Sequence, residues 1–378
     1  MRPNPRMAFR RLLTIVVLFA LTALTAVTQP STAASGSTTH TLPARLSDAD
    51  FWRMVTEFSE GDGYFASDNL VSNELTFQWV IPQLQASWTP GHVYLGVGPD
   101  QNFTYLAALK PSLAFIVDIR RDNLRLQLLY KALIEMSPTR AGFLSRLLSR
   151  EAPVGLAVDV PVGELFTAFA RVKPTEQRFA ATLVAVQERL QVQHGFVLSP
   201  QDLAHVEFVL TAFYFGGPDL TYASSGRSGR YPTYQDLMTA TDEAGKARGY
   251  LASEAHYAVL RDMQLRNLIV PVVGDFTGAK ALQSVAAYLK ARNAVVGAIY
   301  TSNVEQYLFQ YGTWPQYYKN VEALPVDGAS TFIRSCFNTC SNVPWSRSAQ
   351  LLDPVAGLLK DVASGRVFTY YDLLARSR

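Results

Sequence analysis

The chain has 378 residues, of which 48% are hydrophobic and 17% are charged, and its formal net charge is +3. This length and apolar content are sufficient for a sizeable buried core, which excludes an intrinsically disordered chain. The basic side chains form no clustered run, so we expect no nucleic-acid partner.

Residues 1–34 have the anatomy of a secretory signal peptide. Arginines precede an apolar run from Leu12 to Val27, and small residues follow it. The run is shorter than the roughly 20 residues of a membrane span. We therefore expect an extracytoplasmic chain, periplasmic or secreted, with no stable membrane span after signal cleavage. Arg10-Arg11 weakly resembles a twin-arginine signal, so the export route stays open.

Two segments precede the first expected strand. Residues 35–46 are rich in Ser and Thr and predict a disordered tether. Residues 47–90 predict an N-terminal helical segment with a polar loop, Gly61 to Glu74, between helices at Ser47–Phe58 and Leu75–Leu84. The loop is either a set of caps and turns or a lid that contacts substrate, because binding groups concentrate on loops. Its candidate substrate-binding residues are Ser67, Asp68, Asn69 and Asn73.

Residues 91–136 predict the first half of an α/β core. A strand at Val93–Val97 meets the glycines Gly96 and Gly98, a helix follows, and a second strand at Leu113–Val117 ends at Asp118. This order outlines a nucleotide-binding βαβ unit, in which Asp118 has the spacing of a carboxylate that binds ribose hydroxyls. The alternative is a structural unit in which the glycines serve only the turn.

This segment resembles the class I S-adenosylmethionine-dependent methyltransferases, and more narrowly an uncharacterised bacterial family similar to them. Gly96 and Gly98 match the glycine turn of that superfamily, whereas Tyr94 stands in place of its usual acidic residue and Asp100 in place of its third glycine. An acid at position 100 favours the amino group of S-adenosylmethionine over a pyrophosphate, or it caps the next helix.

Two later segments extend the resemblance. Leu268 to Asp275 resembles the third strand of the superfamily and Ala294 to Asn303 resembles the fourth. The resemblance implies that Asp275 contacts the adenine and that polar residues after the fourth strand face cofactor and substrate. The alternative for each acid is a helix cap. The implied S-adenosylmethionine site, at the carboxyl ends of the strands, comprises Gly96, Gly98, Asp100, Asp118, Asp275, Ser302 and Asn303.

The interval at residues 137–262 is too long for an ordinary connection and predicts a helical insertion or cap. Its helical patterns lie at Arg140–Leu148, Glu164–Ala170, Pro174–His194 and Gln201–Tyr214. A Gly/Ser/Arg-rich loop near its end carries Tyr222 and Arg230, which either bind an anionic or sugar-like substrate or belong to a solvated surface.

Residues 263–378 predict the second half of the core. We expect a helix at Val304–Gln310, a turn-rich segment at Thr313–Tyr318 and a strand at Ser330–Phe337. The predicted fold is α/β: a doubly wound, mostly parallel Rossmann-like sheet with a helical insertion between the second and third core strands.

Cys336 and Cys340 are the two cysteines of the chain. In an oxidising compartment they form either a disulfide or two free thiols. Metal binding by this pair is not expected, because zinc takes four ligands and no second pair lies nearby.

Two functions follow. The first is an exported, methyltransferase-like transferase that uses S-adenosylmethionine on a substrate other than nucleic acid, with proximity supplying most of the rate. The alternative is a non-catalytic extracytoplasmic protein that binds a small-molecule or envelope ligand on a degenerate Rossmann-like scaffold. Whether the chain is an enzyme stays open on these residues.

Overall fold

A six-stranded sheet forms the centre of the computed structural model, which describes residues 41–222, 231–337, 340 and 348–377. The strand order is β3-β2-β1-β4-β5-β6. Neighbours pair in parallel except for β5 and β6, which are antiparallel. The predicted mostly parallel α/β sheet is therefore confirmed. The strands are β1 (Val93–Gly96), β2 (Ala114–Asp118), β3 (Ile269–Val273), β4 (Val296–Ser302), β5 (Thr331–Phe337) and β6 (Ser348–Pro354).

The sequence specifies the first three strands as continuous apolar runs, and every residue in them is buried. Such runs are typical of parallel strands that are covered on both faces. From β1 the chain moves outward through β2 to β3, and then returns to place β4 on the other side of β1. The strand order therefore reverses between β1 and β4, and ligands of open α/β sheets bind beyond the carboxyl ends of strands at such a point.

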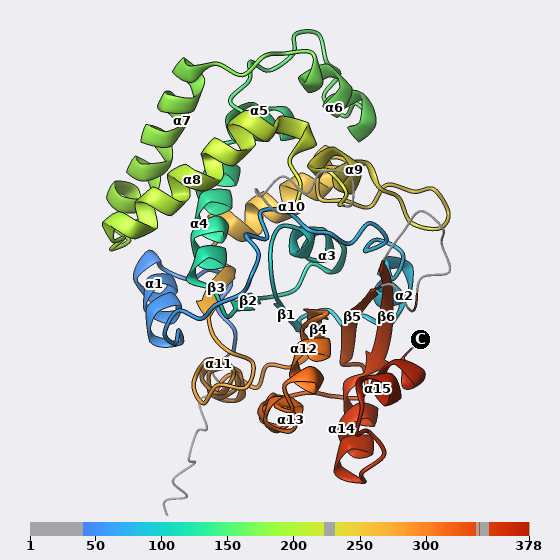
Figure 1. The fold of residues 1–378 in the computed structure, drawn as a ribbon. Helices are drawn as coiled ribbons and strands as arrows, with labels where there is room; N and C mark the ends of the chain where they lie inside the picture. Colours follow the sequence, from blue (N-terminus) through green and yellow to red (C-terminus); the bar gives the residue numbers. More distant parts are fainter. Residues whose placement is uncertain (1–40, 223–230, 338–339, 341–347, 378) are drawn as a thin grey trace, which may run out of the picture. The chain divides into compact units, whose positions relative to one another are not determined.

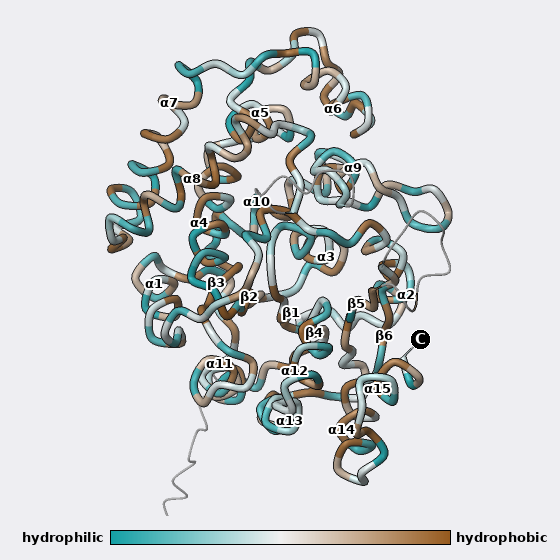
Figure 2. The backbone as a smooth tube through the Cα atoms, in the orientation of Figure 1, coloured by the Kyte–Doolittle hydropathy of each residue, from teal (hydrophilic) through white to brown (hydrophobic). Residues whose placement is uncertain are grey.

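Helices cover both faces of the sheet (Figure 1). On one side lie α3 (Gln101–Leu109), α4 (Arg121–Glu135) and α10 (Glu254–Leu265), with α10 in contact with the other two. On the other side lie α11 (Ala281–Lys290), α13 (Trp314–Glu322) and α14 (Val355–Ala363). Hydrophobic residues colour much of β1, β4 and β5 in Figure 2, between these two layers.

The described residues between β2 and β3 form helices and no named strand, which confirms the predicted helical segment between the second and third strands. Its helix α8 packs against α4 of the core. The predicted boundary at residue 262 falls inside α10, which Ser253 caps and which continues to Leu265. The inserted elements are α5 (Arg140–Leu147), α6 (Val162–Ala170), α7 (Glu176–Gln187), η1 (Glu188–Gln193), α8 (Pro200–Gly216), η2 (Gly217–Asp219) and α9 (Tyr234–Thr239).

The predicted tether at 35–46 extends too far. Leu46 is buried and its N–H donates to the carbonyl of Arg266 at 3.0 Å, while Leu42 packs against the core. Helix α1 (Asp48–Glu57) follows, and its N-cap residue is Ser47, whose side chain accepts a hydrogen bond from the N–H of Asp50. The expected signal peptide at 1–34 and the first part of the tether lie outside the described residues.

Two other predicted segments differ from the structure. Residues 75–80 form turns, and α2 (Ile81–Ser87) starts later than the predicted helix at Leu75. The segment at Thr313–Tyr318, expected to be turn-rich, contains the start of α13. A proline in the first turn favours a helix start at both places, because its missing N–H needs no partner there. The remaining helices are α12 (Val304–Gln310) and α15 (Tyr370–Arg376).

Candidate functional site

The glycine turn after β1 is closed by the chain's own side chains. Asn102 of α3 donates from its amide to the carbonyls of Val97 at 2.9 Å and Pro99 at 2.7 Å, and accepts from the Tyr94 hydroxyl at 2.8 Å. A Cβ at Gly96 would lie 2.0 Å from the Asn102 Oδ1. The glycine is therefore needed for contact with Asn102, whether or not a ligand approaches.

Gly98, the second glycine of the turn, is also buried, with a φ of 81° in the left-handed region that glycine tolerates. Its carbonyl accepts from the side-chain amide of Gln127 in α4 at 3.0 Å. Gly96 is thus the last residue of β1 and Gly98 lies in the turn that follows, as the sequence analysis expects, but both glycines are buried among protein atoms.

Gly96→Ala tests this closed packing. We expect the substitution to lower the free energy of unfolding by about 1–3 kcal/mol, because the added methyl meets the Asn102 amide. A double-mutant cycle with Asn102→Ala, followed by urea denaturation, should show a coupling energy between the two positions, because the smaller side chain removes the nearer of the two contacts of the methyl and leaves the one with the Tyr94 ring. Additive losses would contradict the contact.

Asp100 stands at the N-cap position of α3 but makes no side-chain cap. Its carboxyl is buried and accepts from the Tyr250 hydroxyl at 3.0 Å, and its Oδ1 has no hydrogen-bond partner among the described residues. Burial raises the pKa of this carboxyl to about 7. The interpretation of Asp100 as a helix cap is therefore wrong. Below about pH 7 the group is also neutral, so it offers no negative charge to a cationic ligand.

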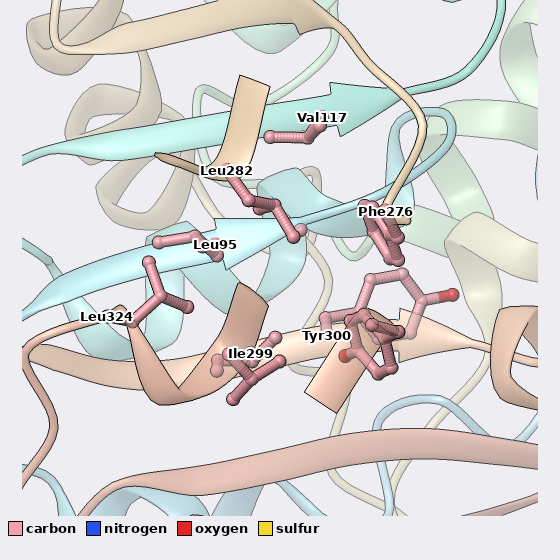
Figure 3. A pocket seen from close by; sticks show the side chains of 10 residues that line it. Leu95, Val117, Phe276, Leu282, Ile299, Tyr300 and Leu324 are labelled. Atoms are coloured by element: carbon pink, nitrogen blue, oxygen red, sulfur yellow. The ribbon is translucent and has the colours of Figure 1, made fainter. Parts of the chain in front are cut away.

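The cavity that touches Gly96 is too small for a nucleoside. Its volume is about 10 Å³, which matches at most one water molecule. Figure 3 shows Leu95, Val117 and Ile299 on three neighbouring strands, with Leu282 and Phe276 among the side chains that fill the space beside them.

Asp118 ends β2 as predicted, and Arg120 contacts it. The Arg120 backbone N–H donates to the Asp118 Oδ1 at 2.9 Å, and the guanidinium Nε lies 3.4 Å from the same oxygen. Both side chains are buried. The Arg120 Nη1 donates to the backbone carbonyls of Ser67 at 2.9 Å and Asp68 at 2.8 Å. The predicted polar loop is thereby held next to the end of β2, and we call residues 60–74 the strap.

Asp275 lies in the turn after β3 and closes that turn on itself. Its Oδ1 accepts from the N–H and the hydroxyl of Thr277, both at 2.8 Å. The N-terminus of α11 that follows receives Glu60 of the strap, whose carboxylate accepts from the N–H groups of Lys280 at 2.9 Å and Ala281 at 2.8 Å. Glu60 thus sits where a helix N-terminus binds an anionic ligand.

Ser302 ends β4 and donates to Glu74 Oε1 at 2.5 Å. The same oxygen accepts from the Tyr300 hydroxyl at 2.8 Å, and Gln350 of β6 donates to Oε2 at 3.1 Å. Burial raises the pKa of the Glu74 carboxyl. Asn303 occupies the N-cap position of α12 without a side-chain cap. Glu74 therefore anchors the end of the strap between β4 and β6.

The structure brings together part of the predicted substrate set. The Leu70 N–H of the strap donates to the carbonyl of Tyr222 at 3.1 Å, so the end of the helical insertion meets the strap. Asn69 has a φ of 48°, and its Oδ1 has no hydrogen-bond partner among the described residues. Asn73 lies half-buried in the strap. Arg230 lies outside the described residues.

Sequence reasoning missed Glu60 and Arg120, and it treated Glu74 only as the last residue of the polar loop. Glu60 directly precedes that loop, and Arg120 follows Asp118 by two positions. The sequence signal that could have found these residues was their position, because each is a charged residue next to the polar loop or to Asp118. Their partners lie far away in the chain, so adjacency alone did not reveal their roles.

The two cysteines form a disulfide, with their Cα atoms 5.7 Å apart, which confirms that alternative over two free thiols. In the part of the chain that the structure describes, no helix has both the length and the apolar character needed to span a membrane. The same residues contain no cluster of His, Cys, Asp and Glu suited to a metal ion.

Comparison with known proteins identifies a family. No curated protein matches the chain. Residues 69–158 and 221–355 match a family model described as a domain of unknown function, DUF7790. The matched segments contain the strap's end, all six strands and Asp118, and they leave out the part of the helical insertion from α6 to η2. Because they make up more than half of the chain, this protein belongs to the DUF7790 family.

Proposed function

We propose that this protein is an extracytoplasmic ligand-binding protein on a degenerate Rossmann-like scaffold. The order β3-β2-β1-β4-β5-β6 is the order of doubly wound dinucleotide-binding sheets, which supports the Rossmann-like assignment. The segment resembling a signal peptide and the Cys336–Cys340 disulfide support an oxidising compartment outside the cytoplasm.

The closed glycine turn is the observation that carries the proposal. A cofactor of adenosine size needs open space beside Gly96, but the Asn102 side chain occupies that position. Arg120 pairs with the Asp118 carboxylate, and Glu60 occupies the N-terminus of α11. Side chains of the protein itself thus occupy the positions at which a nucleotide-binding enzyme holds its cofactor.

Buried polar atoms without a hydrogen-bond partner lie next to the strap and indicate where a ligand would bind. The Arg120 side chain is buried, yet its Nη2 has no hydrogen-bond partner among the described residues. A buried donor without a partner is costly and points to a missing acceptor. The Asn69 Oδ1 is likewise unpaired in that part of the chain. A small ligand with an anionic or carbonyl oxygen would pair with Arg120 once the strap moves aside.

A second candidate function is an S-adenosylmethionine-dependent transferase, favoured by Asp118 at the carboxyl end of β2. In that case opening of the strap would have to precede cofactor binding, and Asn102 would have to leave the glycine turn. The rate would come from alignment of a substrate nucleophile with the sulfonium methyl, so the reaction would not depend on a general base.

Calorimetric titration with S-adenosylmethionine separates the two functions. We expect no binding heat from the wild-type chain lacking residues 1–34, because the glycine turn offers no volume for an adenosine. Binding that is present in the wild type and lost in Asp118→Ala would instead favour the transferase.

Native mass spectrometry of the protein isolated from its own compartment tests directly whether a ligand is bound. We expect a small molecule with an acidic or carbonyl group to accompany the wild type and to be absent from Arg120→Met. An identical carried molecule in both proteins would place the ligand elsewhere and refute the assignment to Arg120.

A further inference from the structure

A groove in the helical insertion has the dimensions of a small-molecule site. Its lining residues belong to α5, α7 and the segments next to α5, and its volume is about 310 Å³. Both helices lie away from β1 (Figure 1). Pockets that bind small ligands begin at about this size. The residues that matter for its chemistry are Met136, Ser137, Ala152, Arg146, Arg178 and Ala181.

Two arginines line this groove, and only one of them is paired. Arg178 donates to the Ser145 hydroxyl at 2.5 Å and to Glu151 at 2.7 Å, so its guanidinium is held in place. Arg146 makes no ion pair and no side-chain hydrogen bond with any residue that the structure describes. The groove therefore presents one guanidinium whose donors are available.

Ser137 provides an independent sign of a missing ligand. The residue is only 1% exposed, and its hydroxyl lies beside the Tyr257 hydroxyl without forming a well-aligned hydrogen bond within the described part of the chain. Buried hydroxyls are normally paired, so an unpaired one in the wall of a groove requires an explanation. An acceptor atom bound in the groove would satisfy it.

Apolar atoms complete the groove. Met136 and Pro138 line it at the end of α4, and Ala152 and Ala181 contribute further methyl groups. Such a lining excludes a bare, fully hydrated ion as the best ligand, because burial of apolar surface would add nothing to its affinity.

We propose that this groove binds a small organic acid, in which a carboxylate or phosphate group is carried on an apolar body. The anionic oxygens accept from the Arg146 guanidinium and the Ser137 hydroxyl, and the apolar body packs against Met136 and the two alanines. A guanidinium matches carboxylate and phosphate equally in geometry, so both head groups belong to the same ligand class.

Titration calorimetry with three probes tests this site in the chain lacking residues 1–34. We expect benzoate and phenyl phosphate to bind, and inorganic phosphate to bind about tenfold more weakly or not at all, because it lacks the apolar body. The ratio of the benzoate and phenyl phosphate affinities then identifies the preferred head group.

Three variants test whether benzoate binds in this groove. Arg146→Gln should weaken benzoate binding about tenfold or more, because it removes a charge-assisted hydrogen bond. Ser137→Ala should weaken it several-fold while the fold is retained. Lys173→Gln, an exposed cation that does not line the groove, is the matched control and should leave the affinity unchanged.

Two outcomes overturn the proposal: no heat from either aromatic acid, or equal benzoate affinity in Ser137→Ala and the wild type. Ser137→Ala decides the matter even if Arg146→Gln fails to fold. Because Arg120→Met leaves the groove untouched, benzoate binding in that variant separates this site from the one next to the strap.

Discussion

Replacing Arg334 with methionine is expected to lower the free energy of unfolding by about 3–5 kcal/mol. Arg334 of β5 is buried, and its guanidinium forms two hydrogen bonds with Glu305, at 2.7 and 3.1 Å, and one with Asp353 at 2.9 Å. Methionine fills a similar volume but leaves the buried Glu305 carboxylate without its cation, whereas the Asp353 carboxylate keeps its ion pair with Arg376. Urea denaturation at pH 7 measures the loss.

Arg366→Met is the matched control for this prediction. Arg366 pairs with Asp361, but its side chain is 59% exposed. Exposed pairs contribute at most about 1 kcal/mol, so the control should stay close to the wild type. Equal losses in the two variants would show that the contacts of Arg334 are no stronger than those of a solvated pair.

The parallel strands were predictable because their signal is local. In Val93 to Gly96 and Ile269 to Val273, buried apolar residues follow one another without interruption, and glycine or an acid ends each run. Parallel strands covered on both faces require such runs. Helix α4 after Asp118 has a local signal of the same kind, because its leucines recur at helical spacing.

The candidate site was less predictable, because its contacts join residues distant in sequence. Glu60 caps α11 across a separation of 221 residues to Ala281, and Glu74 accepts from Tyr300 across a separation of 226. No periodic pattern encodes such pairs. Arg120 shows the same limit, since its partners in the strap are backbone carbonyls that any residue type provides.

Asp100 shows how tertiary packing changes the chemistry of a predicted site residue. Its neighbours Pro99 and Gln101 indicate a helix start, at which an aspartate usually accepts from backbone N–H groups. Tyr250, distant in sequence, instead donates to the carboxyl in the interior. Burial outweighs this hydrogen bond and raises the pKa of the carboxyl to about 7. A residue expected to offer a negative charge is therefore neutral below that pH, and this reversal has a measurable dependence on pH.

Asp100→Asn should therefore change how stability depends on pH. The folded pKa of Asp100 is about 7 against an ordinary value of 3.8, so between these values the folded chain keeps a proton that the unfolded chain has released. The contribution of this group is fully present below about pH 4 and is lost as the pH rises through about 7. Relative to the wild type, Asp100→Asn should gain roughly 4 kcal/mol between pH 4 and pH 8.

The measurement is the difference in unfolding free energy between variant and wild type, obtained by urea denaturation at each pH, which cancels the other titrating groups. Asp372→Asn is the control, because hydrogen bonds from the Phe368 N–H and from Thr369 lower the pKa of the Asp372 carboxyl. Its contribution is lost only as the pH falls through that lowered value, so its difference from the wild type should stay flat between pH 5 and 8. A flat difference for Asp100→Asn as well would mean that the Asp100 carboxyl is ionised in the folded chain, and a charged group next to the glycine turn would then be available to a cationic ligand after all.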